Sequence, residues 1–311
     1  MVKNKNESAI LRYDVLVLKR RGVTRDLPSG TESLQWVANT ATLIYGDHDA
    51  VVVDTFATID QNQQLVDWVT KSGKNVTTIY ITHAHGDHSF GIKILLDRFP
   101  NARAVATSAV VKAMQTQIDP NNIKNFWNKL FPHQIPEPLI VPEALESNEF
   151  ELEGHKLVVL DNGFTDTEYS TSLYVPSIGL VIAGDAVYNG THPYMPETTE
   201  QSRLNWIAAL NRIEGLKPQA VVAGHKNPAN DDNPQHIRAT RKYIRDFNRL
   251  NHQTITGREF FDKMLAQYPD HANPGSLWSS ARAVKQDSKK AMHLCGTPQN
   301  DCKLHSQLIN C

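Results

Sequence analysis

The sequence contains few cysteines, and all of them stand near one end. Cys295, Cys302 and Cys311 are the three cysteines among 311 residues. A disulfide framework therefore does not hold the main body of the chain together. His293 and His305 stand close by, but the irregular spacing favours a frayed tail with free thiols over a small zinc site.

Long apolar runs are equally absent. No segment approaches the roughly 20 apolar residues that a helix needs to cross a bilayer. Residues Met1 to Leu18 mix lysine, asparagine and glutamate with short apolar runs, and they lack the continuous apolar stretch of a secretory signal. We therefore expect no membrane partner and a cytoplasmic location.

The chain has no excess of charge of either sign. Its 32 lysine and arginine residues balance 33 aspartate and glutamate residues, which leaves a net charge of −1 with neutral histidines. A phosphate backbone attracts a basic surface, so this balance argues against a nucleic acid partner. The expected partner is a small-molecule substrate. A homodimer stays open, because the sequence does not fix the oligomeric state.

The chain does contain two stretches in which short β-branched runs alternate with amphipathic helix patterns, at about residues 11–118 and 150–250. Nothing repeats at a short fixed period, which excludes a solenoid. Two sheets back to back with helices outside, an αββα sandwich of the α/β class, fit this order as one domain of residues 1–250. The expected strands are 13–18, 41–45, 50–54, 77–82, 156–160, 172–175, 180–183 and 219–223, and the expected helices follow Thr58 and Ser89 and cover 203–213 and 236–250.

A different kind of segment, residues 119–142, separates these two stretches. Apolar residues recur in it at helical spacing on one face, and a proline-rich run then ends the helix. This segment is either a helix packed on the core or an aromatic lid over a site. The residues that form its apolar face are Ile123, Phe126, Trp127, Leu130 and Phe131.

Residues 251–311 form a C-terminal extension in this interpretation. A helix is expected around 259–267, followed by a loop at 268–278 and the cysteine-containing tail. The sequence does not show whether the extension mediates dimerisation.

The decisive motif is the run Thr82-His83-Ala84-His85-Gly86-Asp87-His88, which joins an apolar strand to an amphipathic helix. His83 and His85 alternate on extended backbone, so they project to the same side. Gly86 permits a sharp turn that a side chain would resist, and Asp87 and His88 then begin the helix. The motif therefore provides two ligand pairs that face adjacent metal positions. Imidazole and carboxylate ligands suit zinc, while iron and manganese are not excluded.

Two residues of the second half are candidates for further ligands. Asp185 and His225 each follow an apolar strand and a glycine, at the junction of a buried strand with a loop. Such strand ends are where α/β proteins usually assemble sites from distant pieces of chain. An isolated residue at such a position is as often a strand cap as a ligand, so this inference depends on the histidine motif.

The T-H-A-H-G-D-H run, the A-G-D after a strand and the later A-G-H together resemble the metallo-β-lactamase superfamily. Their order and spacing cover nearly the whole chain from about Asp14 to Leu250, but they say little about the substrate. The resemblance implies one or two zinc ions, and it implies that Asp54, at the end of an early strand, braces the histidine loop. It assigns His83 and His85 to one metal and Asp87, His88 and His225 to a second, with Asp185 as the bridge.

One position departs from the family pattern. The third histidine of the first metal normally stands in a G-H-T context, where this chain has Gly163-Phe164-Thr165. A phenyl ring cannot coordinate a metal, so the first position is weakened unless Asp166, Asn162 or water substitutes. A single metal, a weakened two-metal site and a protein without hydrolytic activity all stay open.

The resemblance implies a hydrolase that opens a small cyclic ester or amide, a lactone or lactam, by attack of metal-bound hydroxide. Asp87 is then the catalytic residue that carries a proton to the leaving group. An apolar cleft with aromatic walls favours a small neutral cyclic substrate. The substrate-binding candidates are Phe164, Tyr188, His192 and Tyr194.

Two other functions stay open. A pseudoenzyme that is catalytically weak or inactive fits Phe164, although the retained Asp87 argues for an enzyme. An iron-dependent sulfur dioxygenase of the same superfamily normally needs the missing histidine, so Phe164 counts against it.

Overall fold

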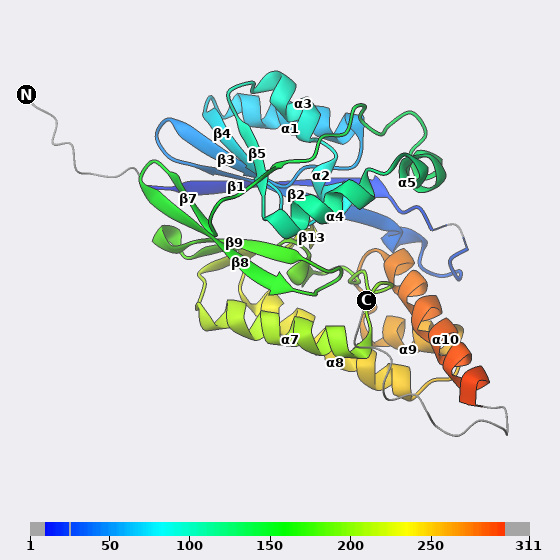
Figure 1. Cartoon of the computed structure of the whole chain (residues 1–311). Coiled ribbons are helices and arrows are strands. Elements are labelled where there is room, and N and C mark those ends of the chain that lie inside the picture. Colours follow the sequence, from blue (N-terminus) through cyan, green and yellow to red (C-terminus); the bar gives the residue numbers. More distant parts are fainter. Residues whose placement is uncertain (1–9, 25, 296–311) are drawn as a thin grey trace, which may run out of the picture.

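The computed structural model describes residues 10–24 and 26–295, and their side chains as far as residue 285. Within these residues two β-sheets pack face to face, and helices cover both outer faces (Figure 1). This arrangement confirms the αββα sandwich that the sequence predicts. Among the described helices, none has the length and apolar character needed to cross a membrane. Cys302 and Cys311 lie outside the described residues, so the prediction of a frayed tail stays a prediction.

The first sheet carries the histidine motif at the end of one of its central strands. Neighbouring strands from β3 to β6 are parallel, whereas β2 pairs antiparallel with β1, β3 and β13. In order, the strands are β11 (Tyr188–Asn189), β13 (His225–Lys226), β2 (Trp36–Tyr45), β3 (Asp49–Val53), β4 (Asn75–Tyr80), β5 (Arg103–Ala106) and β6 (Glu143–Ala144), and β1 (Arg12–Arg21) pairs with β2.

The second sheet brings the later candidate ligands to the same end of the molecule. Its strand β10 pairs antiparallel with β9 and parallel with β12, so the segments after β10 and β12 leave the sheet side by side. In order, the strands are β12 (Ala220–Val222), β10 (Leu180–Ile182), β9 (Ser170–Val175), β8 (His155–Gly163) and β7 (Glu149–Leu152).

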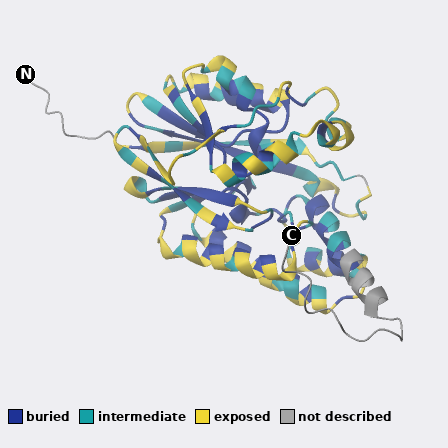
Figure 2. Cartoon of the chain, viewed as in Figure 1, coloured by how far each residue is buried: buried dark blue, intermediate teal, exposed yellow. Residues whose placement is uncertain are grey.

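Alternation along the strands builds the layers of the sandwich. In β3, Val51 and Val53 face the second sheet, whereas Ala50 and Val52 face the helices. Both sets are fully buried, because β3 lies inside the sheet with a layer on each face. Burying each of the three valine side chains stabilises the fold by roughly 1.5–3 kcal/mol. Figure 2 shows the resulting pattern of buried strands and helices that expose only their outer faces.

Helices α1 (Ile59–Lys71), α3 (Ile92–Arg98) and α4 (Ser108–Gln117) cover the first sheet, and α7 (Glu200–Gly215) and α8 (Gln235–His252) cover the second (Figure 1). The Thr58 side chain accepts a hydrogen bond from the Gln61 backbone N–H at 3.3 Å and so caps α1. The sequence predicts all of these helices except α4. It misses the strands β5 and β7 and the two-residue strands β6, β11 and β13.

The C-terminal extension packs on the same core as α7 and α8. Helix α9 (Gly257–Gln267) contributes Phe260 and Phe261 to this core, and α10 (Pro274–Cys295) contributes Leu277. The loop expected at 268–278 is too long, because α10 already begins at Pro274. Proline is favoured in the first turn of a helix, where its missing N–H has no partner to lose.

The segment 119–142 contains α5 (Pro120–Asn122), a π-helical turn (Ile123–Trp127) and α6 (Asn128–Leu130). Ile123 and Trp127 pack with Phe90 in a small buried cluster, whereas 49 % of Phe126 is exposed. The predicted apolar face is therefore only partly buried against the core.

Candidate metal centre

The histidine motif lies on the loop that follows β4 and on the short helix α2 (Gly86–Ser89). His83 and His88 are fully buried, and their ring centroids lie 4.4 Å apart. A side chain is resisted at Gly86, as expected, although its φ is not positive and the backbone itself does not require glycine. A Cβ at Gly86 would instead lie 2.4 Å from the Phe90 ring, so the missing side chain makes room for that ring.

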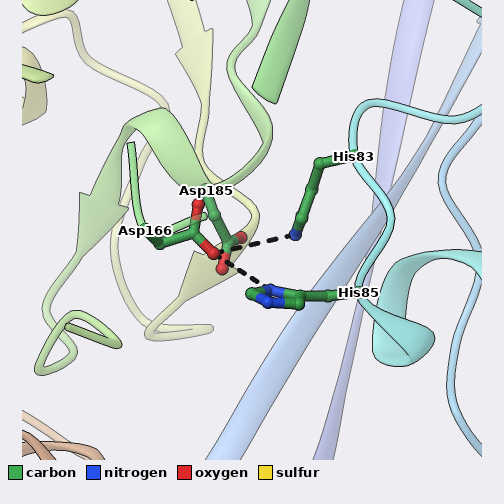
Figure 3. A group of neighbouring side chains, drawn as sticks. All are labelled: His83, His85, Asp166 and Asp185. Atoms are coloured by element: carbon green, nitrogen blue, oxygen red, sulfur yellow. Dashed lines mark ion pairs between the residues drawn. The ribbon is translucent and has the colours of Figure 1, made fainter. Parts of the chain in front are cut away.

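A first group of donors comes from both sheets. His83 and His85 face Asp166 and Asp185 across the junction between the sheets (Figure 3). The Asp166 Oδ2 atom lies 3.0 Å from His85 Nδ1 and 3.9 Å from His83 Nε2. The donor atoms of these residues all lie within 4.8 Å of one another, which is close enough for one ion to reach them together.

Asp166 therefore occupies the place where the family pattern leads one to expect a histidine. Phe164 is half-buried and is not part of the group, and the side chain of Asn162 donates to Ser172 at 2.8 Å. Of the substitutes that the sequence left open, Asp166 is the one whose side chain reaches the histidines.

A second group contains Asp87, His88 and His225, whose donor atoms also lie within 4.8 Å of one another. The Asp185 carboxylate contacts it, with Oδ1 at 3.3 Å from His88 Nε2 and Oδ2 at 3.2 Å from His225 Nε2. Because Asp185 also belongs to the first group, it lies between the two, as a bridging ligand would. Whether these residues bind metal stays a prediction.

Gly224 allows Asp185 to take this position. A Cβ at Gly224 would lie 2.1 Å from Asp185 Oδ1, so any side chain there would displace the carboxylate. The Tyr188 hydroxyl donates to Asp185 Oδ2 at 2.6 Å, and the Tyr188 ring stacks on His225. These contacts fix the carboxylate between the two groups.

Asp54 lies where a bracing residue must lie. One of its oxygens accepts from the Thr82 backbone N–H and the other from the Thr82 hydroxyl, both at 2.8 Å. His88 Nδ1 lies 3.2 Å from Asp54, which leaves Nε2 facing Asp185. Asp54 adopts a positive φ of 62°, a strained conformation that aspartate tolerates better than most residues.

The buried donors of the first group fit a divalent cation. His83 Nε2, Asp166 Oδ2 and Asp185 Oδ1 are buried and lack a hydrogen-bond partner among the described residues. Native proteins pair nearly all buried polar atoms, so converging unpaired nitrogen and oxygen atoms indicate a ligand that is shared. Imidazole and carboxylate donors are the set that zinc and similar ions take.

The carboxylates of Asp185 and Asp54 shift the pKa of His88, and the pKa of Asp185 is shifted in turn. Burial acts to lower the pKa of His88, but the nearby Asp185 and the hydrogen bond to Asp54 outweigh it and raise the pKa to about 10. Burial likewise opposes ionisation of Asp185, yet His225 and His88 hold its pKa well below the usual range. In the absence of an ion, a proton on His88 therefore balances part of the carboxylate charge.

This proton makes cation binding depend on pH. A metal needs neutral imidazole, so an ion that binds Asp87, His88 and His225 must displace the His88 proton at neutral pH. We expect release of about one proton and an affinity that rises by up to about tenfold per pH unit between about pH 7 and 10. Titration calorimetry of the metal-free protein with Zn²⁺ in buffers of different ionisation enthalpy measures this release. A heat that is the same in all buffers would contradict the pKa assigned to His88.

Glu197 holds the outer nitrogen of His85. His85 Nε2 lies 3.2 Å from Glu197 Oε1, and the Thr167 hydroxyl donates to Glu197 Oε2 at 2.7 Å. Burial acts to raise the pKa of Glu197, but the hydrogen bond with His85 outweighs it and lowers the pKa, so the group is a carboxylate. A carboxylate on Nε2 fixes the tautomer that presents Nδ1 to Asp166 and the cavity.

We expect Glu197→Ala to weaken cation binding at the His83–His85 group by about 10- to 100-fold, since it frees the His85 ring. Glu197→Gln keeps an acceptor and is expected to lose less. Competition with a chromophoric chelator measures the affinity. Glu200→Ala, which removes an exposed acid that pairs with His252, is the matched control. Equal affinities for Glu197→Ala and this control would show that Glu197 does not orient His85.

A cavity of about 890 Å³ opens beside the two groups. Tyr188 and Tyr194 line it, as do residues of the 119–142 segment and of α10. Phe164 and His192 do not line it, so their expected substrate contacts have no support in the structure. His192 is fully buried, and its Nδ1 hydrogen-bonds with the Tyr243 hydroxyl at 2.8 Å, which makes it part of the core.

Sequence reasoning missed several residues of the site. Asn39 on β2 donates to Asp87 Oδ2 at 2.9 Å, and Arg20 on β1 also contacts Asp87. Neither these residues nor Glu197 stand in a motif, so no local signal marks them. Asp166 alone had a signal, because it stands two positions after the missing histidine.

A family model and a curated relative match parts of the chain. The family model described as "Metallo-beta-lactamase superfamily" matches residues 34–225. The chain is 34 % identical over 64 residues to a hydroxyacylglutathione hydrolase of Francisella tularensis subsp. novicida, a stretch of 21 % of this chain. The match spans only about a quarter of the length of that relative, 24 % of its chain.

Solved structures share the fold at low sequence identity. A metallo-beta-lactamase family protein from Thermus thermophilus superimposes with a TM-score of 0.58 at 20 % identity, over 89 % of this chain and 94 % of that one. A metallo-beta-lactamase from Pontibacter korlensis gives a TM-score of 0.55 at 16 % identity, over 78 % and 98 % of the two chains. At these identities the likeness concerns the fold alone.

Proposed function

The chain belongs to the metallo-beta-lactamase superfamily, and on this premise we propose that it is a metal-dependent hydrolase of a carbonyl substrate, an ester, lactone or lactam. The observation that carries the proposal is the pair of donor groups that share Asp185 beside a large cavity. His83, His85 and Asp166 would hold one ion, and Asp87, His88 and His225 the other. A bound ion supplies Lewis-acid chemistry, because it polarises a carbonyl and lowers the pKa of water.

Asp87 is placed to accept and pass on a proton. It lines the cavity, and in the absence of an ion the nearby His88 outweighs its burial and holds its pKa well below the usual range, so the group is a carboxylate. The bond from Asn39 orients its Oδ2 atom. A carboxylate at this place can take a proton from water and give it to the leaving group.

Tyr188 does not compete for the nucleophile role. Burial raises the pKa of its hydroxyl well above the usual range, and the nearby Asp185 carboxylate adds to this shift. The phenol therefore stays protonated and keeps donating to Asp185. Its part is to hold the carboxylate that the two groups share.

Asp166 favours an enzyme over a pseudoenzyme. The argument for weak metal binding rested on Phe164, and Asp166 provides a carboxylate beside both histidines of that group. A three-histidine iron site, which the sulfur dioxygenase alternative needs, has no third histidine in this group among the described residues.

A thioester is the second candidate substrate class. The similarity to hydroxyacylglutathione hydrolases supports it, although the match covers only 64 residues. The same residues could act on an oxygen ester, an amide or a thioester, because all three present a carbonyl carbon to the cavity.

The test is a hydrolysis assay on the purified full chain, loaded with Zn²⁺, Mn²⁺ or Fe²⁺, against lactones, lactams, aryl esters and thioesters. We expect turnover of at least one class that is lost on chelation and restored by the metal, and lost in His88→Ala. An enzyme that turns over equally well after complete metal removal would refute the proposal. The ratio of thioester to lactone turnover decides between the two substrate classes.

A further inference from the structure

Arg20 lies at the wall of the cavity, next to the donor groups. It stands near the end of β1, and 15 % of its side chain is exposed. Its Nη2 atom lies 3.5 Å from Asp87 Oδ2, at the limit of a hydrogen bond. Because Asp87 also accepts from Asn39 at 2.9 Å, the contact with Arg20 is the weaker of the two.

Two nitrogen atoms of the Arg20 guanidinium have no hydrogen-bond acceptor among the described residues. Its Nε and Nη1 atoms are buried and have no hydrogen-bond partner among the described residues. A guanidinium carries N–H donors on every nitrogen, and a buried donor without a partner destabilises the folded state. Such a group points to an acceptor that joins it in the functional state.

Aromatic residues of the 119–142 segment continue this wall. The Arg20 guanidinium lies 5.2 Å from the centre of the Phe131 ring, and Phe131 stacks with Trp127 at 6.2 Å. The Trp127 indole nitrogen is also buried without a hydrogen-bond partner. We call Arg20, Phe131 and Trp127 the cationic–aromatic wall. The two rings give this wall an apolar surface, and the polar atoms of the wall that lack a hydrogen-bond partner are all N–H donors.

The acids of the cavity other than Asp87 are already paired. Asp26 forms an ion pair with Arg282 across the cavity rim, and Glu197 accepts from Thr167 and contacts His85. Asp119 caps α5 by accepting from the Asn121 backbone N–H at 2.9 Å. If Asp87 binds a cation, its charge is shared with that ion. No other acid among the described residues of the cavity then neutralises Arg20.

We propose that Arg20 binds a carboxylate of the substrate, while an apolar, ring-containing body lies along Phe131 and Trp127. This inference rests on the proposed hydrolase and narrows its substrate to an acid: an ester, thioester, lactone or lactam that also carries a free carboxylate. The free volume of about 890 Å³ exceeds what a simple lactone fills, so it accommodates such a body. Arginine suits this part because its planar fork matches a carboxylate.

The test is a binding cycle on the full-length, metal-loaded protein with 3-phenylpropanoate and its neutral amide, 3-phenylpropanamide. Calorimetry gives both Kd values for the wild type and for Arg20→Gln. We expect the wild type to prefer the acid, and the variant to bind the acid about 10- to 100-fold more weakly but the amide within about threefold of wild type. Contacts of the carboxylate with the ions are common to both proteins and cancel in the cycle.

Arg282→Gln is the matched control, since it removes a cation from the same cavity at a more exposed position. It is expected to leave the acid-to-amide ratio within about twofold. Arg20→Lys keeps the charge without the fork and is expected to restore part of the preference; this variant guards against a folding defect in Arg20→Gln.

Three results would overturn the inference. The first is a wild type that binds the acid no more tightly than the amide. The second is an Arg20→Gln variant whose affinities for the acid and the amide fall by the same factor, and the third is an Arg282→Gln variant that loses as much affinity for the acid as Arg20→Gln. The second result would mean that Arg20 serves only to support Asp87. Because binding needs no turnover, a failure of the hydrolase proposal shows in the hydrolysis assay and not in this cycle.

Discussion

Asp166→Ala is expected to lose at least about 100-fold in affinity for the ion held by His83 and His85. The variant removes the carboxylate oxygen that lies 3.0 Å from His85 Nδ1, and only Asp185 then remains beside the two histidines. The first ion then loses one of its four protein ligands and the only carboxylate that the second group does not share, so its site is weaker. Metal content after dialysis against a mild chelator, with the thermal unfolding temperature as a check on folding, measures the loss.

Nearby substitutions make this prediction specific. Glu168→Ala removes an exposed acid close to Asp166 in sequence and is expected to leave the metal content unchanged. Phe164→His in the Asp166→Ala background tests whether a histidine in the family's usual place can restore the ion. If Asp166→Ala keeps its full metal content under the same dialysis, Asp166 is not a ligand and the first group needs another account.

Asp87→Asn is expected to have the largest effect on turnover, a fall of about 10²- to 10⁴-fold in kcat. Asparagine has nearly the same shape but cannot carry a proton at neutral pH. The hydrogen bonding of the position changes little, since Asn39 can still donate to the amide oxygen. Steady-state kinetics with saturating metal measures the effect, so that a weaker metal affinity does not account for the loss.

Asp26→Asn is the control for this experiment, because it neutralises an acid at the cavity rim that takes no part in either donor group. We expect its kcat to stay within about twofold of wild type. If Asp87→Asn retains more than a tenth of the wild-type kcat with both ions bound, proton transfer does not pass through Asp87.

The fold was largely predictable because its signals are local. Alternation in β3 and the helical spacing of Leu65 and Val69 are properties of consecutive residues, and the structure follows both. The His83–His88 run is also local, because the end of β4 and the short helix α2 fix the backbone positions of its side chains. Superfamily membership followed from the same run together with the later Asp185 and His225.

Other features depend on contacts between residues far apart in the chain. Asp166 reaches His85 only because β8 and β9 carry its loop to the end of β4 in the other sheet. Arg20 meets Asp87, and Glu197 meets His85, across 67 and 112 positions of sequence. No periodicity encodes such pairings, and surface residues of the same types look identical in the sequence.

The sequence by itself therefore determined the layers of the sandwich and the presence of imidazole and carboxylate donors at its strand ends, since both follow from side-chain alternation and local backbone geometry. Only the tertiary structure decided which carboxylate completes the first group, that His192 is a core residue, and that the cavity wall includes Arg20 and α10. Those outcomes depend on how two sheets and a C-terminal helix pack, and packing is a property of the whole chain.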